Sequence, residues 1–146
     1  MAGPSVSAFK KGDEIYAATN FQFCRANAQY AVADANMVAL RPSHLSHVEA
    51  ASTPVIAVTA WQMLFEYGNV KRGQTVMILG AAGNVGAYAV QLAANAGLHI
   101  IGIVASKDIG YVKTLGSQTV ADYQAGKFEY AVRPVDLILD TAGGET

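Results

Sequence analysis

The chain has 146 residues, a formal net charge of −1 and only 14% charged residues, so it has no basic face for general nucleic-acid binding. Its single cysteine, Cys24, excludes an internal disulfide framework and any zinc site that needs several cysteines. No apolar run approaches the about 20 residues of a membrane span, and the first residues lack the pattern of a signal peptide, so we expect a cytoplasmic protein.

Two short β-strands are predicted in the first third of the chain. A turn over residues 11–13 leads into the first, Glu14–Ala17, and the second is predicted over Tyr30–Ala33. Strands this short belong to a barrel-like unit, and we expect them to pair with strands that the chain does not obviously supply. The segment is therefore predicted to be one part of a β-rich unit.

A helix is predicted to follow this β-rich segment. Ser46 and Glu49 have the spacing of a capping box, and the helix is expected to restart after Pro54. His44 and His47 lie in the same segment, at a spacing that would also suit two metal ligands on one helical turn. No third ligand is apparent nearby in the sequence, so we interpret both histidines as part of a capped helix start.

The strongest pattern of the chain is a strand, a glycine-rich turn and a helix. The apolar run Val76–Leu79 predicts a strand buried on both faces, and apolar residues recur at helical spacing from Asn84 onward. At such a junction, free backbone N–H groups and the helix dipole make a site for a pyrophosphate. Gly83 and Gly86 match the last two glycines of the dinucleotide-binding fingerprint, although a turn that collects glycine for steric reasons alone is the alternative.

Strands and helices continue to alternate after this helix, which implies a parallel sheet. The predicted strands are His99–Val104, Thr119–Asp122 and Val135–Asp140, and the predicted helix is Asp108–Leu115. In a doubly wound sheet these strands would lie in the order 3-2-1-4, with the fourth at an edge that is normally covered. The predicted fold class is therefore α/β, with a partial doubly wound parallel (Rossmann) sheet.

The residues after the second strand of such a sheet contact the adenosine ribose. An acidic side chain there favours the 2′-hydroxyl of NAD, and a basic one favours the 2′-phosphate of NADP. Here the strand is followed by Ala105-Ser106-Lys107. We favour Lys107 as a phosphate contact over an ordinary solvated lysine, and we interpret Asp108 as the cap of the next helix. NADP(H) is therefore predicted in preference to NAD(H).

Several segments, in order and spacing, resemble the medium-chain dehydrogenase/reductase family and, within it, the zinc-independent quinone oxidoreductases. They are Phe9-Lys-Lys-Gly-Asp-Glu-Ile-Tyr16, Glu49-Ala-Ala, Pro54-Val-Ile-Ala-Val-Thr-Ala-Trp61, Gly80-Ala-Ala-Gly-Asn-Val-Gly86, Gln91-Leu-Ala and Asp140-Thr-Ala-Gly-Gly144. The resemblance implies that residues 1–55 are part of a GroES-like catalytic domain. It implies that residues 56–146 are the first half of an NAD(P)-binding Rossmann domain.

The resemblance also implies which residues hold the cofactor. The implied pyrophosphate loop is Gly83, Asn84, Val85 and Gly86, and the implied 2′-phosphate contacts are Ser106, Lys107 and Tyr123. Thr59 matches the family threonine near the nicotinamide end, and a hydroxyl bonded to the preceding helical turn is the alternative for this residue. The segment Asp140–Gly144 matches the loop that passes beside the cofactor, although a plain turn after a strand would look the same.

No metal site and no catalytic residue are assigned. Val55 stands where zinc enzymes of the family place a ligating cysteine, and Cys24 stands alone where their structural zinc needs a cysteine-rich lobe. Cys24 has no evident base beside it in sequence, so we interpret it as a packed residue and not as a nucleophile. The residues with which this branch faces its substrate would lie upstream of Met1.

The resemblance, together with these patterns, implies two classes of function. The first is an NADPH-dependent oxidoreductase that transfers hydride to a quinone or another electrophilic carbonyl or enone, and the second is a catalytically incomplete nucleotide-binding or interaction module. RNA binding, known for some members of the branch, is a weaker third because the charge is low. We expect a small-molecule substrate, no membrane partner, and a homo-oligomer or a covering partner chain, since 52% of the residues are hydrophobic.

Overall fold

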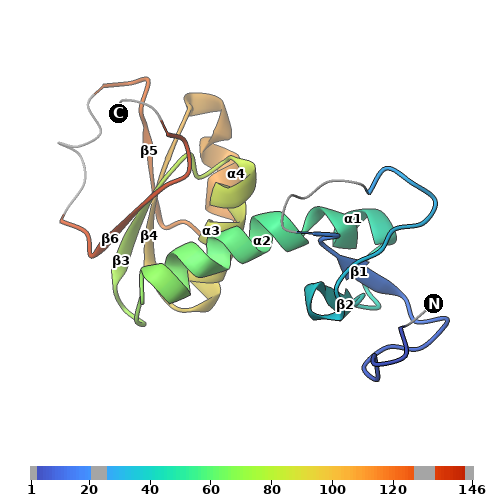
Figure 1. Cartoon of the computed structure of the whole chain (residues 1–146). Helices are drawn as coiled ribbons and strands as arrows, with labels where there is room; N and C mark the ends of the chain where they lie inside the picture. The colour runs from blue at the N-terminus through green and yellow to red at the C-terminus, as the bar shows by residue number, and fades with distance from the viewer. Residues whose placement is uncertain (1–2, 21–25, 127–133, 144–146) are drawn as a thin grey trace. The chain divides into compact units, whose positions relative to one another are not determined.

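The computed structural model describes residues 3–20, 26–126 and 134–143. By its internal contacts the chain divides into two compact units, Met1–Val55 and Ile56–Thr146 (Figure 1). The predicted turn at residues 11–13 is present, and Cys24 lies outside the described residues. None of the helices in the described ranges has the length and hydrophobicity that crossing a bilayer requires.

The first unit contains a small antiparallel sheet. Its strands are β1 (Ile15–Ala17) and β2 (Val38–Leu40), with Tyr16 opposite Ala39. The strand predicted over Tyr30–Ala33 is wrong, because this stretch is irregular, and β1 finds its partner within the chain. A 3-10 turn, η1 (Ala35–Met37), leads directly into β2, and the Asp34 side chain caps this turn.

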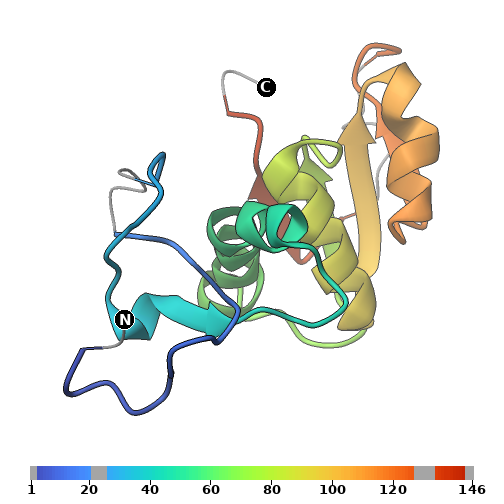
Figure 2. The ribbon, with the colours of Figure 1, turned by 90° about the vertical axis from the view of Figure 1, so that its right-hand side faces the viewer.

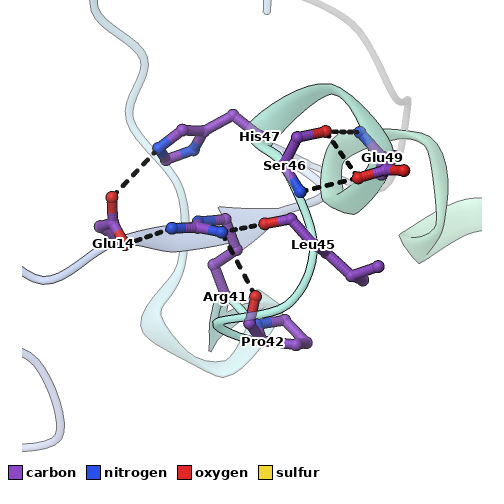
Figure 3. Close-up of polar contacts among 7 residues, drawn as sticks. All are labelled: Glu14, Arg41, Pro42, Leu45, Ser46, His47 and Glu49. Atoms are coloured by element: carbon purple, nitrogen blue, oxygen red, sulfur yellow. Dashed lines mark hydrogen bonds and ion pairs between the residues drawn. The ribbon is translucent and has the colours of Figure 1, made fainter.

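An arginine links the sheet of the first unit to the segment that follows it. The Arg41 guanidinium donates to the Glu14 carboxylate and to the backbone oxygens of Pro42 and Leu45 (Figure 3). His47 Nε2 lies 3.5 Å from the other Glu14 oxygen. Hydrogen bonding by Arg41, followed by its charge, holds the pKa of Glu14 below its ordinary value of 4.5. The side chain of Arg41 therefore ties together the strand and the chain that leads into the next helix.

Helix α1 (His47–Ser52) begins with the predicted capping box. The Ser46 hydroxyl accepts the Glu49 N–H, and the Glu49 carboxylate accepts the Ser46 N–H at 2.8 Å (Figure 3). This pair of bonds satisfies backbone donors that a helix of six residues cannot satisfy internally. The capped start that we inferred from spacing is confirmed.

The second unit alternates helices and strands. Helix α2 (Pro54–Trp61) continues into a π-helical segment, η2 (Gln62–Tyr67), which ends at Gly68. The elements that follow are β3 (Thr75–Leu79), α3 (Asn84–Asn95), β4 (His99–Val104), η3 (Ser106–Asp108), α4 (Ile109–Thr114), β5 (Thr119–Asp122) and β6 (Leu137–Asp140). β3, α3, β4 and β5 confirm the predictions, whereas β6 begins two residues later than predicted.

The four strands of this unit form a parallel sheet in the order β5-β4-β3-β6. Thr75 lies opposite His99, and Val76 lies opposite Leu137. This order is the predicted 3-2-1-4, and β6 is an edge strand of the described sheet. The carboxyl ends of β3, β4, β5 and β6 therefore meet at one side, where ligands bind in open α/β sheets.

Both faces of the two central strands, β3 and β4, are buried, as their continuous apolar runs predict. On one face, Val76, Ile78 and Ile100 pack with residues of η2, α3 and α4, including Leu64, Val90 and Val112. Figure 2, seen from the side of Figure 1 that carries the helices, shows α3 beside β4. On the other face, Met77, Leu79, Ile101 and Ile103 form a second apolar cluster. The period of two along β3 and β4 assigns alternate residues to the two clusters.

Helix α3 packs against the end of β3 at unusually short range. A Cβ atom at Gly86 would lie 2.2 Å from the Gly80 carbonyl oxygen and 2.9 Å from the Ala81 Cα. Both atoms belong to the backbone, so no side-chain movement can make room for it. Glycine at position 86 is therefore a requirement of the packing between helix and strand.

We predict that Gly86→Ala destabilises the chain by about 2 kcal/mol or more, because the added methyl overpacks backbone against backbone. The matched control is Gly110→Ala, since Gly110 lies in α4 with nothing within 4 Å of an added Cβ. That substitution should be neutral or stabilise by about 0.5 kcal/mol through helix propensity. Urea unfolding followed by circular dichroism measures both, and equal effects of the two substitutions would contradict the packing argument.

A second prediction concerns the pH dependence of the capped helix. Hydrogen bonding from the Ser46 backbone, followed by its hydroxyl, holds the pKa of Glu49 below its ordinary value of 4.5. A lowered folded-state pKa gives stability that is present above the unfolded pKa and is lost as the pH falls through the folded pKa. Glu49→Gln should therefore lower the thermal midpoint at about pH 7, and this effect should become smaller as the pH falls below 4.5. The exposed Glu66→Gln serves as the control.

Candidate functional site

A pocket of about 670 Å³ opens at the carboxyl ends of β3 and β4, within the second unit. It is the edge of the sheet at which the strand ends meet, so loops that are distant in sequence line it together. The lining residues come from the end of β3, the turn after it, the end of β4, η3, the residue after β5 and the loop after β6. They are Leu79, Gly80, Ala82, Gly83, Ile103, Val104, Ala105, Lys107, Asp108, Tyr123 and Ala142.

The turn after β3 forms one wall of this pocket. Gly80 has a φ of +71°, a conformation that favours glycine, and its N–H donates to the Ile103 carbonyl oxygen at 3.1 Å. The Gly83 N–H donates back to the Gly80 carbonyl oxygen at 2.8 Å, which closes the turn. The turn is therefore fixed by its own backbone, and at Gly80 and Gly83 no side chain stands between the backbone and the pocket.

Helix α3 begins immediately after this turn. Gly83 is its N-cap residue, and no side chain caps the first N–H groups of the helix. The N–H groups of the first helical turn, at Asn84, Val85 and Gly86, have no acceptor within the helix itself. Together with the helix dipole, these donors favour an anion at this end of α3, which is twelve residues long.

The loop after β6 forms another part of the wall. The Thr141 hydroxyl donates to the Leu79 carbonyl oxygen at 2.6 Å, and the Thr141 N–H donates to the same oxygen at 3.2 Å. The Asp140 carboxylate accepts the N–H groups of Ala142 and Gly143 at 3.0 and 2.9 Å. These bonds fix the loop against the end of β3, so that Ala142 lies at the pocket.

Charged side chains meet the pocket at η3, after β4. Lys107 and Asp108 both line it. The neighbouring Ser106 hydroxyl donates to the Asp122 carboxylate, whose other oxygen accepts the Gln124 N–H at 2.8 Å. The Tyr123 N–H donates to the Val104 carbonyl oxygen at 3.2 Å. The ends of β4 and β5 are thus joined to each other, and Tyr123 is fixed at the pocket rim.

The structure brings together some of the residues that the sequence singled out. Gly83, Lys107 and Tyr123 line the same pocket, although they come from different loops. The backbone of Asn84, Val85 and Gly86 begins α3 beside it. Ser106 is bonded to Asp122 and does not line the pocket, and Thr59, half-buried in α2, does not line it either. The cofactor roles of all these residues stay predictions.

Other pocket residues were not singled out as site residues, although Ala142 belongs to the segment Asp140–Gly144 that matches the loop beside the cofactor. Ala82, Ala142 and Ala105 are small residues that reach the pocket only because the strand ends converge. Asp108 was expected to cap the next helix, and this expectation is wrong in its physical detail. It occupies the N-cap position of α4 without any hydrogen bond from its side chain to the helix. The sequence cannot show that this bond is missing, because an aspartate at the start of a predicted helix looks the same whether or not its side chain caps the helix.

Metal ligation has no support in the described part of the chain. No three His, Cys, Asp or Glu side chains among residues 3–20, 26–126 and 134–143 gather closely enough to hold an ion. His47 faces Glu14, as described above, and helix α1 begins with the capping box. The interpretation of this segment as a capped helix start therefore agrees with its geometry.

Known proteins of similar sequence are oxidoreductases by name, although no model of a protein family matches the chain. The human protein named NAD(P)H oxidoreductase RTN4IP1, mitochondrial, is 34% identical over 99% of this chain and 38% of its own length. The quinone-oxidoreductase homolog of spinach chloroplasts is 38% identical over 85% of this chain and 39% of its own. The chain thus spans about two fifths of the length of these relatives.

The names of these relatives overturn the expected cytoplasmic location. The human protein is named mitochondrial and the spinach protein chloroplastic, and a fungal relative from Arthroderma benhamiae, at 29% identity, is named a probable zinc-binding oxidoreductase, mitochondrial. The expectation rested on the lack of a membrane-spanning apolar run and of a signal-peptide pattern in the sequence. Such a pattern reports only on secretion, so it was too weak an observation to assign a compartment.

Solved structures give the same family. The quinone oxidoreductase from Coxiella burnetii superposes with a TM-score of 0.89 at 30% identity, over 97% of this chain and 45% of that one. An alcohol dehydrogenase superfamily protein from Novosphingobium aromaticivorans has the same TM-score at 34% identity, with the same coverage. With its parallel sheet, its glycine turn and these relatives, the chain belongs to the medium-chain dehydrogenase/reductase family, among the quinone oxidoreductase-like members.

Proposed function

We propose that this chain forms the cofactor-binding part of an oxidoreductase that uses NADPH. The main support is the pocket at the carboxyl ends of β3 and β4. The start of α3, which no side chain caps, and Lys107 both lie at this pocket. The names of the relatives, NAD(P)H oxidoreductase and quinone oxidoreductase homolog, support a nicotinamide cofactor. They do not distinguish NADPH from NADH, so that choice rests on the residues of the pocket.

The residues present fit a dinucleotide in three respects. A Cβ atom at Gly83 would lie 3.2 Å from the Gly80 carbonyl oxygen, so the turn is tight and keeps its backbone accessible to a pyrophosphate. The end of β4 supplies apolar walls through Ile103 and Val104, which suit an adenosine. Lys107 supplies a positive charge beside these walls, where a 2′-phosphate would find it.

The bound nicotinamide supplies the hydride, and we propose a quinone or another electrophilic carbonyl or enone as its acceptor. The part of the reaction that belongs to this chain is binding and orientation. The first turn of α3 would hold the pyrophosphate, with Asn84 and Val85 contributing backbone donors. Lys107 and Tyr123 would hold the 2′-phosphate, with Ser106 nearby, and Thr59 would lie toward the nicotinamide. We assign no catalytic residue.

The alternative is a nucleotide-binding or interaction module that does not turn over substrate. It rests on the same pocket, for which no catalytic residue is assigned among the described residues. The two functions are separated by adding a quinone to the chain with NADPH and following absorbance at the nicotinamide band. Oxidation of NADPH supports the enzyme, whereas binding of NADPH without oxidation supports the module.

We further propose that a second copy of the chain or another polypeptide covers part of the second unit. Ile138 on the edge strand β6 is 57% exposed, and Tyr67 at the end of η2 is 82% exposed. Together with Met63, Gly68 and Leu137 they line a shallow apolar hollow. Exposed apolar side chains beside an unpaired strand edge favour association.

The first prediction of this proposal concerns the cofactor preference. Lys107→Ala should weaken NADPH binding by about tenfold and leave NADH binding nearly unchanged, because only NADPH has the 2′-phosphate. Isothermal titration calorimetry of the chain with each cofactor measures this. Lys113→Ala is the matched control, since Lys113 lies exposed on α4 outside the pocket. Failure of the unmutated chain to bind either cofactor would contradict the proposed function.

A second prediction concerns the loop after β6. Thr141→Val keeps the shape of the side chain but removes the hydroxyl that donates to the Leu79 carbonyl oxygen. Losing this bond should lower the free energy of unfolding by about 1 kcal/mol. It should also weaken the binding of NADPH and of NADH by a similar factor, because the loop is held less firmly at the pocket. The ratio of the two dissociation constants should stay constant, in contrast to the effect of Lys107→Ala. A change in that ratio would contradict the prediction, because it would mean that the loop also affects the choice between the two cofactors.

A further inference from the structure

Asp108 is a carboxylate at the pocket that has no structural role in the described chain. It stands at the N-cap of α4, yet its side chain makes no capping bond. By contrast, the Asp34 side chain caps η1 and the Ser46 side chain caps α1. No hydrogen bond or ion pair joins the Asp108 carboxylate to any residue in the described ranges, and it is half-buried in the pocket wall.

The backbone holds this carboxylate at the pocket. The Asp108 N–H donates to the Ala105 carbonyl oxygen at 2.9 Å, and the Ile109 N–H donates to the Ser106 carbonyl oxygen. These two bonds form η3 and fix the position of the Asp108 Cα between the end of β4 and the start of α4. A polar side chain on a fixed backbone, exposed to a cavity and unused by the fold, is available to a ligand.

Lys107 is the neighbour with the opposite charge, and it lines the same pocket. The described residues offer it no ion pair, whereas the nearby Ser106 and Asp122 side chains are bonded to each other. Within the described part of the chain, the wall at η3 therefore presents a cation and an anion, each without an ion-pair partner, to the same ligand. The cation fits a phosphate group, and the anion, which can only accept hydrogen bonds, fits hydroxyl donors.

From this arrangement we propose that Asp108 is a specificity-determining residue whose carboxylate accepts a hydrogen bond from a ribose hydroxyl of the cofactor, and thereby keeps NADH usable beside NADPH. The inference rests on the proposed function, because it names a further residue of the same nucleotide site. Lys107 attracts a 2′-phosphate, and Asp108 repels it while binding the free ribose diol of NADH. The two neighbours therefore act on selectivity in opposite directions.

The expected consequence is a limited preference for NADPH in the unmutated chain. Removing the anion should increase that preference, because NADPH loses a like charge beside its phosphate and NADH loses a charged acceptor. We expect Asp108→Asn to raise the ratio of the NADH to the NADPH dissociation constant by about tenfold. This substitution keeps the size of the side chain, and no capping bond is lost because none is present.

The test uses the whole chain and two probes that differ only in the 2′-phosphate, adenosine 2′,5′-bisphosphate and 5′-AMP, next to NADPH and NADH. Isothermal titration calorimetry gives the dissociation constant of each ligand for the unmutated chain and for Asp108→Asn. The ratio of the 5′-AMP to the adenosine 2′,5′-bisphosphate dissociation constant should rise together with the ratio of the NADH to the NADPH dissociation constant. Both pairs of ligands have the same adenosine ribose, with and without the 2′-phosphate. Circular dichroism checks that the variant keeps its helices.

The control variant is Glu66→Gln, which removes one negative charge from an exposed position of η2 outside the pocket. It should leave both ratios unchanged, which separates a local contact from an effect of net charge. Asp108→Asn with unchanged ratios, or with an equal loss for every ligand, overturns the inference and leaves the proposed function standing. No binding of any ligand by the unmutated chain overturns the proposed function, and the inference with it.

Discussion

The close approach of helix α3 to the end of β3 is the constraint on which the proposed nucleotide pocket depends. The helix can begin beside the sheet only because Gly86 has no Cβ and lies against the Gly80 carbonyl group. That contact places the first turn of α3, whose N–H groups have no acceptor within the helix, beside the pocket wall at Gly83. A single steric condition therefore sets the packing of the core and, at the same time, the position of the anion-binding backbone.

The loops around this helix start are held by backbone acceptors at the strand ends. The Leu79 carbonyl oxygen accepts from Thr141, the Ile103 carbonyl oxygen from Gly80, and the Val104 carbonyl oxygen from Tyr123. Each of these bonds ties one loop to a neighbouring strand, so the pocket is a continuation of the sheet and not a gap between mobile loops. These bonds hold the backbone of the strand ends, after which two adjacent residues, Lys107 and Asp108, present opposite charges at the pocket.

The strands of the second unit could be predicted from the sequence more completely than those of the first. Within the second unit, β3 and β4 have five and six residues of continuous apolar character and are buried on both faces, and this pattern has few competing interpretations. Within the first unit, the strands have only three residues each and are partly exposed, so their pattern in the sequence is weak. The sequence therefore predicted a strand at Tyr30–Ala33, whereas the structure has one at Val38–Leu40. The pairing of β2 with β1 is a tertiary choice that no local pattern encodes.

By itself the sequence determined the α/β class, the capping box at Ser46 and Glu49 and the glycine turn, because each depends on local spacing and on steric limits at single residues. The strand order followed from the alternation of strands and helices together with the topology of doubly wound sheets. Only the tertiary structure decided which residues share the pocket. It joined Ser106 to Asp122, placed Ala142 at the wall and left the Asp108 carboxylate without a capping bond. These outcomes depend on where strand ends converge and on which hydrogen-bond partner lies nearer, and neither is determined by neighbours in sequence.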